Sequence, residues 1–114
     1  IDAGGDLTLC VGEETAETQN FQVDSRTLCR ISPAFNRMLL GPWSESKPTD
    51  DQKDWRVSLP VDLPGPLAVI LNIIHSRFDH LPANLNFHQL DDLLVLMDKY
   101  IISLLLIKRW IQQW

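Results

Sequence analysis

The sequence predicts an α+β fold, a small three-stranded sheet packed on a cluster of about five helices. Two observations favour this class. Apolar and polar residues alternate in three short segments, 7–11, 21–23 and 55–59, as in strands with one buried face. Elsewhere, most apolar residues follow the spacing of helices. Because strands dominate the first part of the chain and helices the second, we expect helices covering a sheet.

Length and charge limit the kinds of protein that fit. The 114 residues allow a single domain, 1–114, whose core we expect over about 5–112. The formal net charge of −5 disfavours nucleic acid and anionic membrane as partners, because both need a cationic surface. No apolar run reaches the length of a membrane span, and no signal peptide is visible.

The first two strands and the first two helices have clear local signals. Segment 21–23 is expected to return beside 7–11 as a hairpin, because the alternation resumes there after a polar connection. Two short helices should follow, Ser25–Ile31 and Pro33–Leu40. Ser32 is a good N-cap, and Pro33 lacks only an N–H that would be unpaired at the first helical position.

The second half of the chain predicts three more helices. Segment 67–74 is almost entirely apolar and predicts a central, buried helix. Residues 77–85 form a short link with room for a little extended structure. The next helix carries an apolar stripe of Phe87, Leu90, Leu93, Leu94 and Met97. The last, over 101–114, is apolar almost all round.

Four short motifs, in this order, resemble those of BTB/POZ domains of the kind common in fungal proteins. They are GDLTLCVG at 5–12, FQVDSRTL at 21–28, SPAFNRML at 32–39, and the segment 93–100, which ends in MDKY. Asp24 stands where the family usually has His, and Met97 where Ala is common. Asp24 can still cap the following helix, so the resemblance implies the BTB/POZ fold. It also implies an intracellular protein-interaction module without catalysis or cofactor.

The resemblance further implies a surface for a cullin-type E3 ubiquitin ligase. BTB adaptors carry an apolar-x-Glu motif just after the second helix, and here Trp43 and Glu45 match it. An exposed Trp can anchor an interface, and an acidic rim can select a basic partner. Tyr100 would lie near the same surface. Alternatively, Trp43 covers the domain's own core, Glu45 is solvated, and Tyr100 is half-buried at a helix junction.

A second version is homo-oligomerisation, as in BTB transcription regulators and scaffolds, with a possible homodimer. The C-terminal segment has more apolar residues than one helix face can bury, and Trp110, Ile111 and Trp114 are the candidate self-association residues. The alternative is that they complete the helical cluster. Residues 41–54 form a long loop without periodicity, and we expect disorder over 47–53.

The sequence gives little support for metal binding or catalysis by this chain. The separations of His75, His80 and His88 put no two of them on one helical face, so no metal site is expected. No nucleophile elbow or phosphate-binding glycine loop is present, so no catalytic residue is assigned. A small metal-binding or hydrolytic domain is the remote alternative.

The two cysteines indicate a compartment. Cys10 and Cys29 lie in a predicted strand and a predicted helix, and they do not form a CxxC pair. We expect two reduced, buried thiols in a protein of the cytoplasm or nucleus.

Overall fold

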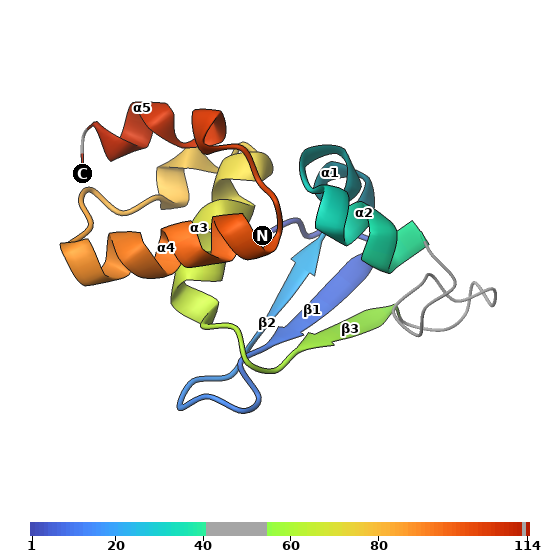
Figure 1. The fold of residues 1–114 in the computed structure, drawn as a ribbon. Coiled ribbons are helices and arrows are strands. Elements are labelled where there is room, and N and C mark those ends of the chain that lie inside the picture. Colours follow the sequence, from blue (N-terminus) through green and yellow to red (C-terminus); the bar gives the residue numbers. More distant parts are fainter. Residues whose placement is uncertain (41–54, 113) are drawn as a thin grey trace.

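The computed structural model describes residues 1–40, 55–112 and 114, and these form an α+β fold (Figure 1). Its elements, in order, are β1 (Leu7–Val11), β2 (Gln19–Val23), α1 (Ser25–Ile31), α2 (Pro33–Leu40), β3 (Arg56–Leu59), α3 (Pro64–Ile74), the 3₁₀ helix η1 (Phe78–His80), α4 (Phe87–Lys99), the 3₁₀ helix η2 (Leu104–Leu106) and α5 (Lys108–Ile111). The predicted class is confirmed.

The sheet has the strand order β2-β1-β3, so β1 is central. It pairs antiparallel with β2 and parallel with β3, and Leu9 lies opposite both Phe21 and Val57. Gly12 ends β1 with φ +83°, a conformation that glycine adopts without strain. The predicted hairpin and all three predicted strands are therefore confirmed.

One face of this sheet is buried and the other is open. The buried face carries Leu7, Leu9, Val11, Phe21, Val23, Val57 and Leu59. The helices lie above and beside the sheet in Figure 1. On the opposite face, the paired rows Gln22–Thr8–Arg56 and Asn20–Cys10–Ser58 are half-buried or exposed. This alternation is the pattern of a sheet covered on one side.

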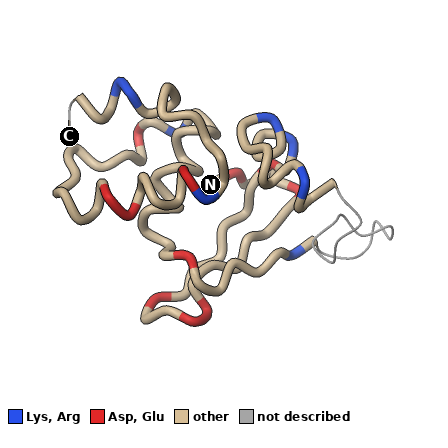
Figure 2. Tube along the Cα trace, in the orientation of Figure 1, with Lys and Arg blue, Asp and Glu red and all other residues tan. Residues whose placement is uncertain are grey.

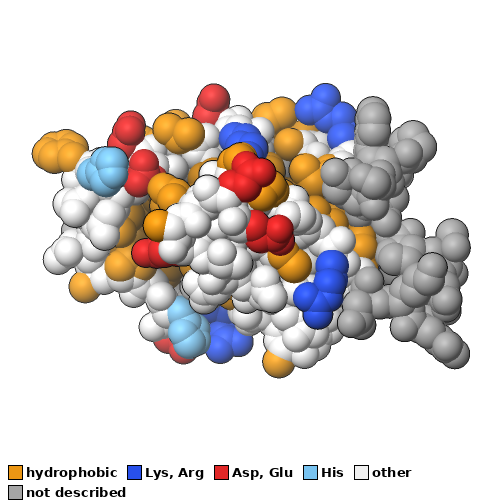
Figure 3. Space-filling view, turned by 90° about the horizontal axis from the view of Figure 1, so that it is seen from below, with side chains coloured by type: hydrophobic (Ala, Val, Ile, Leu, Met, Phe, Trp, Pro, Cys, Tyr) orange, Lys and Arg blue, Asp and Glu red, His pale blue; other side chains and the backbone are white. Residues whose placement is uncertain are grey.

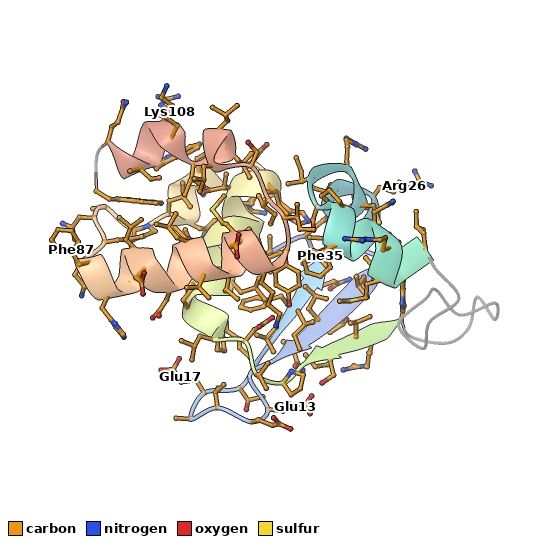
Figure 4. All side chains as sticks on the ribbon, viewed as in Figure 1. Glu13, Glu17, Arg26, Phe35, Phe87 and Lys108 are labelled. Atoms are coloured by element: carbon orange, nitrogen blue, oxygen red, sulfur yellow. The ribbon has the colours of Figure 1, made fainter. Side chains whose placement is uncertain are left out.

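Caps set the bounds of α1 and α2, which match the prediction. The Asp24 carboxylate accepts from the Arg26 N–H at 3.4 Å and from Thr27 Oγ1 at 2.8 Å. Ser32 Oγ accepts from the Phe35 N–H at 3.0 Å. Phe35 points into the interior in Figure 4 and is 1% exposed. These short polar side chains therefore start both helices, as expected for N-caps.

The helix predicted over 67–74 is α3, which begins slightly earlier, at Pro64. Its buried residues include Leu67, Ile70, Leu71 and Ile73, which confirms a central, buried helix. The link after it is not extended, and the described residues 77–85 contain η1 instead. Ser76 has φ 61°, and the N–H groups of Ser76 and Arg77 bond back to the carbonyls of Ile73 and Asn72. This Schellman motif reverses the chain directly after α3.

Helix α4 differs from the predicted stripe at its first residue. Phe87 is 92% exposed and points away from the body of the molecule in Figure 4. The physical reason is the capping box that precedes it. Asn86 Oδ1 accepts from the Gln89 N–H at 2.8 Å, and Gln89 Oε1 accepts from the Asn86 N–H at 3.1 Å. This box starts the helix beyond the edge of the core, which α4 reaches through Leu93, Leu96 and Met97.

The predicted last helix over 101–114 is wrong as a continuous helix. Ile101 has φ 56°, its N–H bonds to the Asp98 carbonyl at 3.2 Å, and the Ile102 N–H bonds to the Met97 carbonyl at 2.8 Å. This is a second Schellman motif, with Ile in the position that glycine usually occupies. The chain then forms η2 and the four-residue α5, which lie along the top of Figure 1, above α4. No helix among the described residues is long and apolar enough to cross a membrane.

Candidate protein-interaction surface

Two of the predicted partner-binding residues, Trp43 and Glu45, lie outside the described residues. The predicted disorder over 47–53 also falls there. The third predicted residue, Tyr100, is described.

Tyr100 lies in the core, more deeply buried than the half-buried junction residue that was the alternative to a partner contact. Its side chain is 2% exposed and stacks on Phe35, with ring centroids 4.3 Å apart. Its hydroxyl donates to the Asp62 carboxylate, and its carbonyl accepts from Ser32 Oγ at 2.5 Å. Burial of the ring, the hydroxyl bond and the backbone bond hold this residue between α2 and α4, so its side chain presents almost no surface to a partner.

Asp62 gives this junction a buried charge. It is 3% exposed, and its second carboxylate oxygen accepts from Lys99 Nζ at 2.5 Å. Burial, followed by the hydrogen bond to Asp62, raises the pKa of the Tyr100 hydroxyl. The tyrosine therefore stays protonated and keeps donating to the carboxylate. The cluster of Asp62, Lys99 and Tyr100 joins the turn before α3 to the end of α4.

The aromatic residues predicted for self-association contact their own chain. Trp110 packs on Phe78 with centroids 5.2 Å apart, and Trp114 Nε1 donates to the Pro82 carbonyl at 3.1 Å. Both rings, like Ile111, are half-buried against the core. They therefore complete the helical cluster over η1 and residues 81–85, although each keeps some exposed area.

Three apolar side chains a few residues earlier are more exposed. Ile101, Leu104 and Leu105 are 51%, 58% and 78% exposed. Leu104 and Leu105 also line a hollow of about 580 Å³ with Ile111 and the stem of Lys108. We call Ile101, Leu104, Leu105 and this hollow the C-terminal patch. The sequence signal was the run of three leucines, because three successive residues cannot share one buried helix face.

Charge is distributed unevenly around the C-terminal patch. Figure 2 shows basic residues on α1, α2 and α5, and acidic residues along α4 and on the loop between β1 and β2. Lys108 and Arg109 follow the patch directly and are exposed. Leu104 and Leu105 of the patch belong to η2, near the top of Figure 1. Seen from below, hydrophobic side chains form small groups separated by polar atoms (Figure 3). The patch therefore combines leucine side chains with a cationic border.

The three histidines occupy separate places. The His75 ring bridges the end of α3 to the start of α1: Nδ1 lies 2.8 Å from the Leu71 carbonyl, and Nε2 accepts from the Asp24 N–H at 3.1 Å. These two bonds require the neutral ring with its proton on Nδ1. His88 lies 3.6 Å from Asp92 on α4, and His80 lies beside Arg77. Among the described residues, no three metal-ligating side chains cluster.

The cysteines are free but less buried than predicted. Cys10 and Cys29 are both half-buried. Cys10 lies on the open sheet face because the pleat turns alternate β1 residues away from the core. Burial and the nearby carboxylates of Asp6 and Asp24 raise the pKa of the Cys29 thiol, so it remains protonated and weakly reactive.

No family model matches the chain, and no curated protein matches it.

Proposed function

We propose that this chain is a protein-interaction module of the BTB/POZ kind and that it performs no chemistry of its own. The order of its four motifs supports this, since they span β1, the entry to α1, the start of α2 and the end of α4. The motif residues Ser32 and Tyr100 also bond to each other. Free thiols at Cys10 and Cys29 support a site of action in the cytoplasm or nucleus, where cysteines stay reduced.

The observation that carries the interaction function is the C-terminal patch. Leucine side chains that are 58% and 78% exposed border a hollow of about 580 Å³. Apolar surface grouped in this way, with a polar border, is typical of protein–protein contact sites. We propose two versions of the function: a cullin adaptor, which uses Trp43 and Glu45, and a self-associating module, which uses the C-terminal patch.

In the first version, the domain recruits a cullin-type E3 ubiquitin ligase through Trp43 and Glu45. Calorimetric titration with a purified cullin N-terminal domain tests it. We expect binding that weakens at least about tenfold, roughly 1.4 kcal/mol, in Glu45→Ala. Glu17→Ala is the matched control, because Glu17 lies on the loop between β1 and β2 (Figure 4) and is exposed. Absence of binding by the wild-type chain would contradict the cullin version.

In the second version, two copies associate through the C-terminal patch. Light scattering over a range of concentrations should give masses rising from 13.1 kDa toward twice that value. Leu105→Asp should hold the mass at the monomer value, because a carboxylate would have to be desolvated in the contact. Val95→Asp is the control, since Val95 is 60% exposed on α4. A wild-type mass that stays at 13.1 kDa at every concentration would exclude this version.

A further inference from the structure

A second candidate binding surface lies between α3 and the outer edge of β2. It is built from two adjoining hollows. One, of about 380 Å³, is mainly apolar and lies between α3, residues 80–85 and α4. The other, of about 500 Å³, is more polar and lies between α3, residues 1–3 and β2. Both are lined by Ala68, Asn72 and His80, so together they form one groove along α3.

The polar end of the groove offers backbone hydrogen-bonding groups. β2 is an edge strand because the sheet order is β2-β1-β3. The Gln22 carbonyl points away from β1 and accepts from the Asp2 N–H at 2.9 Å. Asn20, two positions earlier, faces the same way, because backbone groups alternate sides along a strand. No backbone hydrogen bond from another described segment reaches Asn20. An extended chain could continue the pairing there, as in β-strand addition.

The positively charged side chain of Arg77 lies beside this edge of β2. Arg77 lines the same hollow as Asn20 and is exposed. One of its nitrogens donates to the Ile1 carbonyl at 3.2 Å, and the other lies 3.0 Å from His80 Nε2. A guanidinium has five N–H donors, so these two contacts leave others for a carboxylate. Asp79 lies 3.5 Å from His80 and is the acidic neighbour at this end.

The other end of the groove is apolar. Its walls are Pro66 and Val69 of α3, Pro82 and Leu85 of the link, and Leu93 of α4. A volume of about 380 Å³ accommodates one large apolar side chain with room to spare. From these three features we infer that the groove binds an extended peptide of a partner protein. The peptide pairs with Asn20 and places an acidic side chain on Arg77 and an apolar side chain beside Val69.

The groove shares no lining residue with the C-terminal patch, so it is a further candidate surface beyond the proposed function. Its test is selection of displayed random peptides of about seven residues on the wild-type chain. We expect enriched sequences that combine an acidic and an apolar residue. Their affinity should fall at least about tenfold in Arg77→Glu and remain unchanged in Arg109→Glu, an exposed arginine of α5.

Two further measurements make the outcome decisive. N-methylation of the peptide amide opposite Asn20 should abolish binding without altering the protein, and amide NMR shifts should fall on Asn20 and Gln22. Arg77→Gln, which removes the charge without reversing it, should lose most of the affinity. No enrichment, equal binding by Arg77→Glu, or no effect of N-methylation would each overturn the inference. Shifts at Leu104 and Leu105 would overturn it while supporting the C-terminal patch.

Discussion

The two most apolar stretches of the chain, α3 and residues 101–111, fold differently. α3 is a regular helix of eleven residues with Leu67, Leu71 and Ile70 at 0–1% exposure. The C-terminal stretch divides into η2 and α5, buries Ile107 completely, and leaves Leu105 78% exposed. The hydrophobicity of a segment therefore does not decide whether it becomes a helix.

The neighbours of each stretch explain the difference. α3 contacts α1, α4, β2 and η1, so several sides of the helix are covered. α5 contacts the adjacent η2 and packs on η1 through Trp110 and Phe78. Short helices are marginal in water, and tertiary packing supplies most of their stability. The two segments therefore differ in how many of their sides are covered by other elements.

The largest expected effect comes from truncating one leucine in each stretch. Leu71→Ala should lower the free energy of unfolding by about 2–5 kcal/mol, because it leaves a cavity at a fully buried site. Leu105→Ala should change it by less than about 0.5 kcal/mol, because the side chain is exposed. Urea denaturation of the monomer measures both. Similar losses in the two variants would contradict the comparison.

The junction between the two regions should respond next. Tyr100→Phe keeps the ring stacked on Phe35 but removes the hydroxyl that donates to Asp62. A loss of about 1–3 kcal/mol is expected, because a buried carboxylate loses one of its partners. Denaturation of Tyr100→Phe beside the wild type measures it. A stability equal to that of the wild type would show that Lys99 alone satisfies the carboxylate.

The same hydroxyl should make stability fall in alkali. The pKa of Tyr100 is raised by burial and by Asp62, so the folded chain keeps this proton at pH values where the unfolded chain has lost it. The contribution of Tyr100 to the free energy of unfolding should therefore be constant below about pH 10 and decrease above it. Denaturation curves between about pH 8 and pH 11 should show a smaller fall for Tyr100→Phe. Parallel curves for the two proteins would contradict the assignment.

The smallest effect concerns the residues that end the two long helices. Ser76 and Ile101 occupy the left-handed position of their Schellman motifs, with φ 61° and 56°. Because β-branched residues tolerate this region poorly, Ile101→Gly should raise the free energy of unfolding by about 0.5–1 kcal/mol, and Ser76→Gly should raise it less. Thermal and urea unfolding of both variants test the order. The reverse order would show that lost contacts of Ile101 outweigh the relief of strain.

Local signals account for the parts of the fold that the sequence predicted. The bounds of α1 and α2 followed from Ser32 and Pro33, whose effects act within one helical turn. The strands followed from alternation, which the covered sheet face requires. Such features depend on near neighbours in the chain, so periodicity and capping chemistry are sufficient to predict them.

The features that escaped prediction depend on distant partners or on unusual residues. Ser76 and Ile101 adopt positive φ without being glycine, so the break after Lys99 had no Gly signal. For Tyr100 the sequence left a partner contact and a helix junction open, because the Asp62 carboxylate that its hydroxyl binds lies 38 positions earlier. A continuous helix over 101–114 would have left Trp110 among its exposed apolar residues. Because the chain turns after α4 instead, Leu104 and Leu105 are exposed.

Because β1 is the central strand, its two edges are expected to pair at different stages of folding. Leu9 faces Phe21, 12 positions later, on one edge and Val57, 48 positions later, on the other. Closing the fourfold longer loop costs about 1.2 kcal/mol more chain entropy, so the hairpin should assemble first. Until β3 arrives, the second edge of β1 presents open backbone groups next to Leu9 and Val11. Refolding at high concentration therefore exposes a template for pairing between chains, and slow dilution should suppress the resulting aggregates.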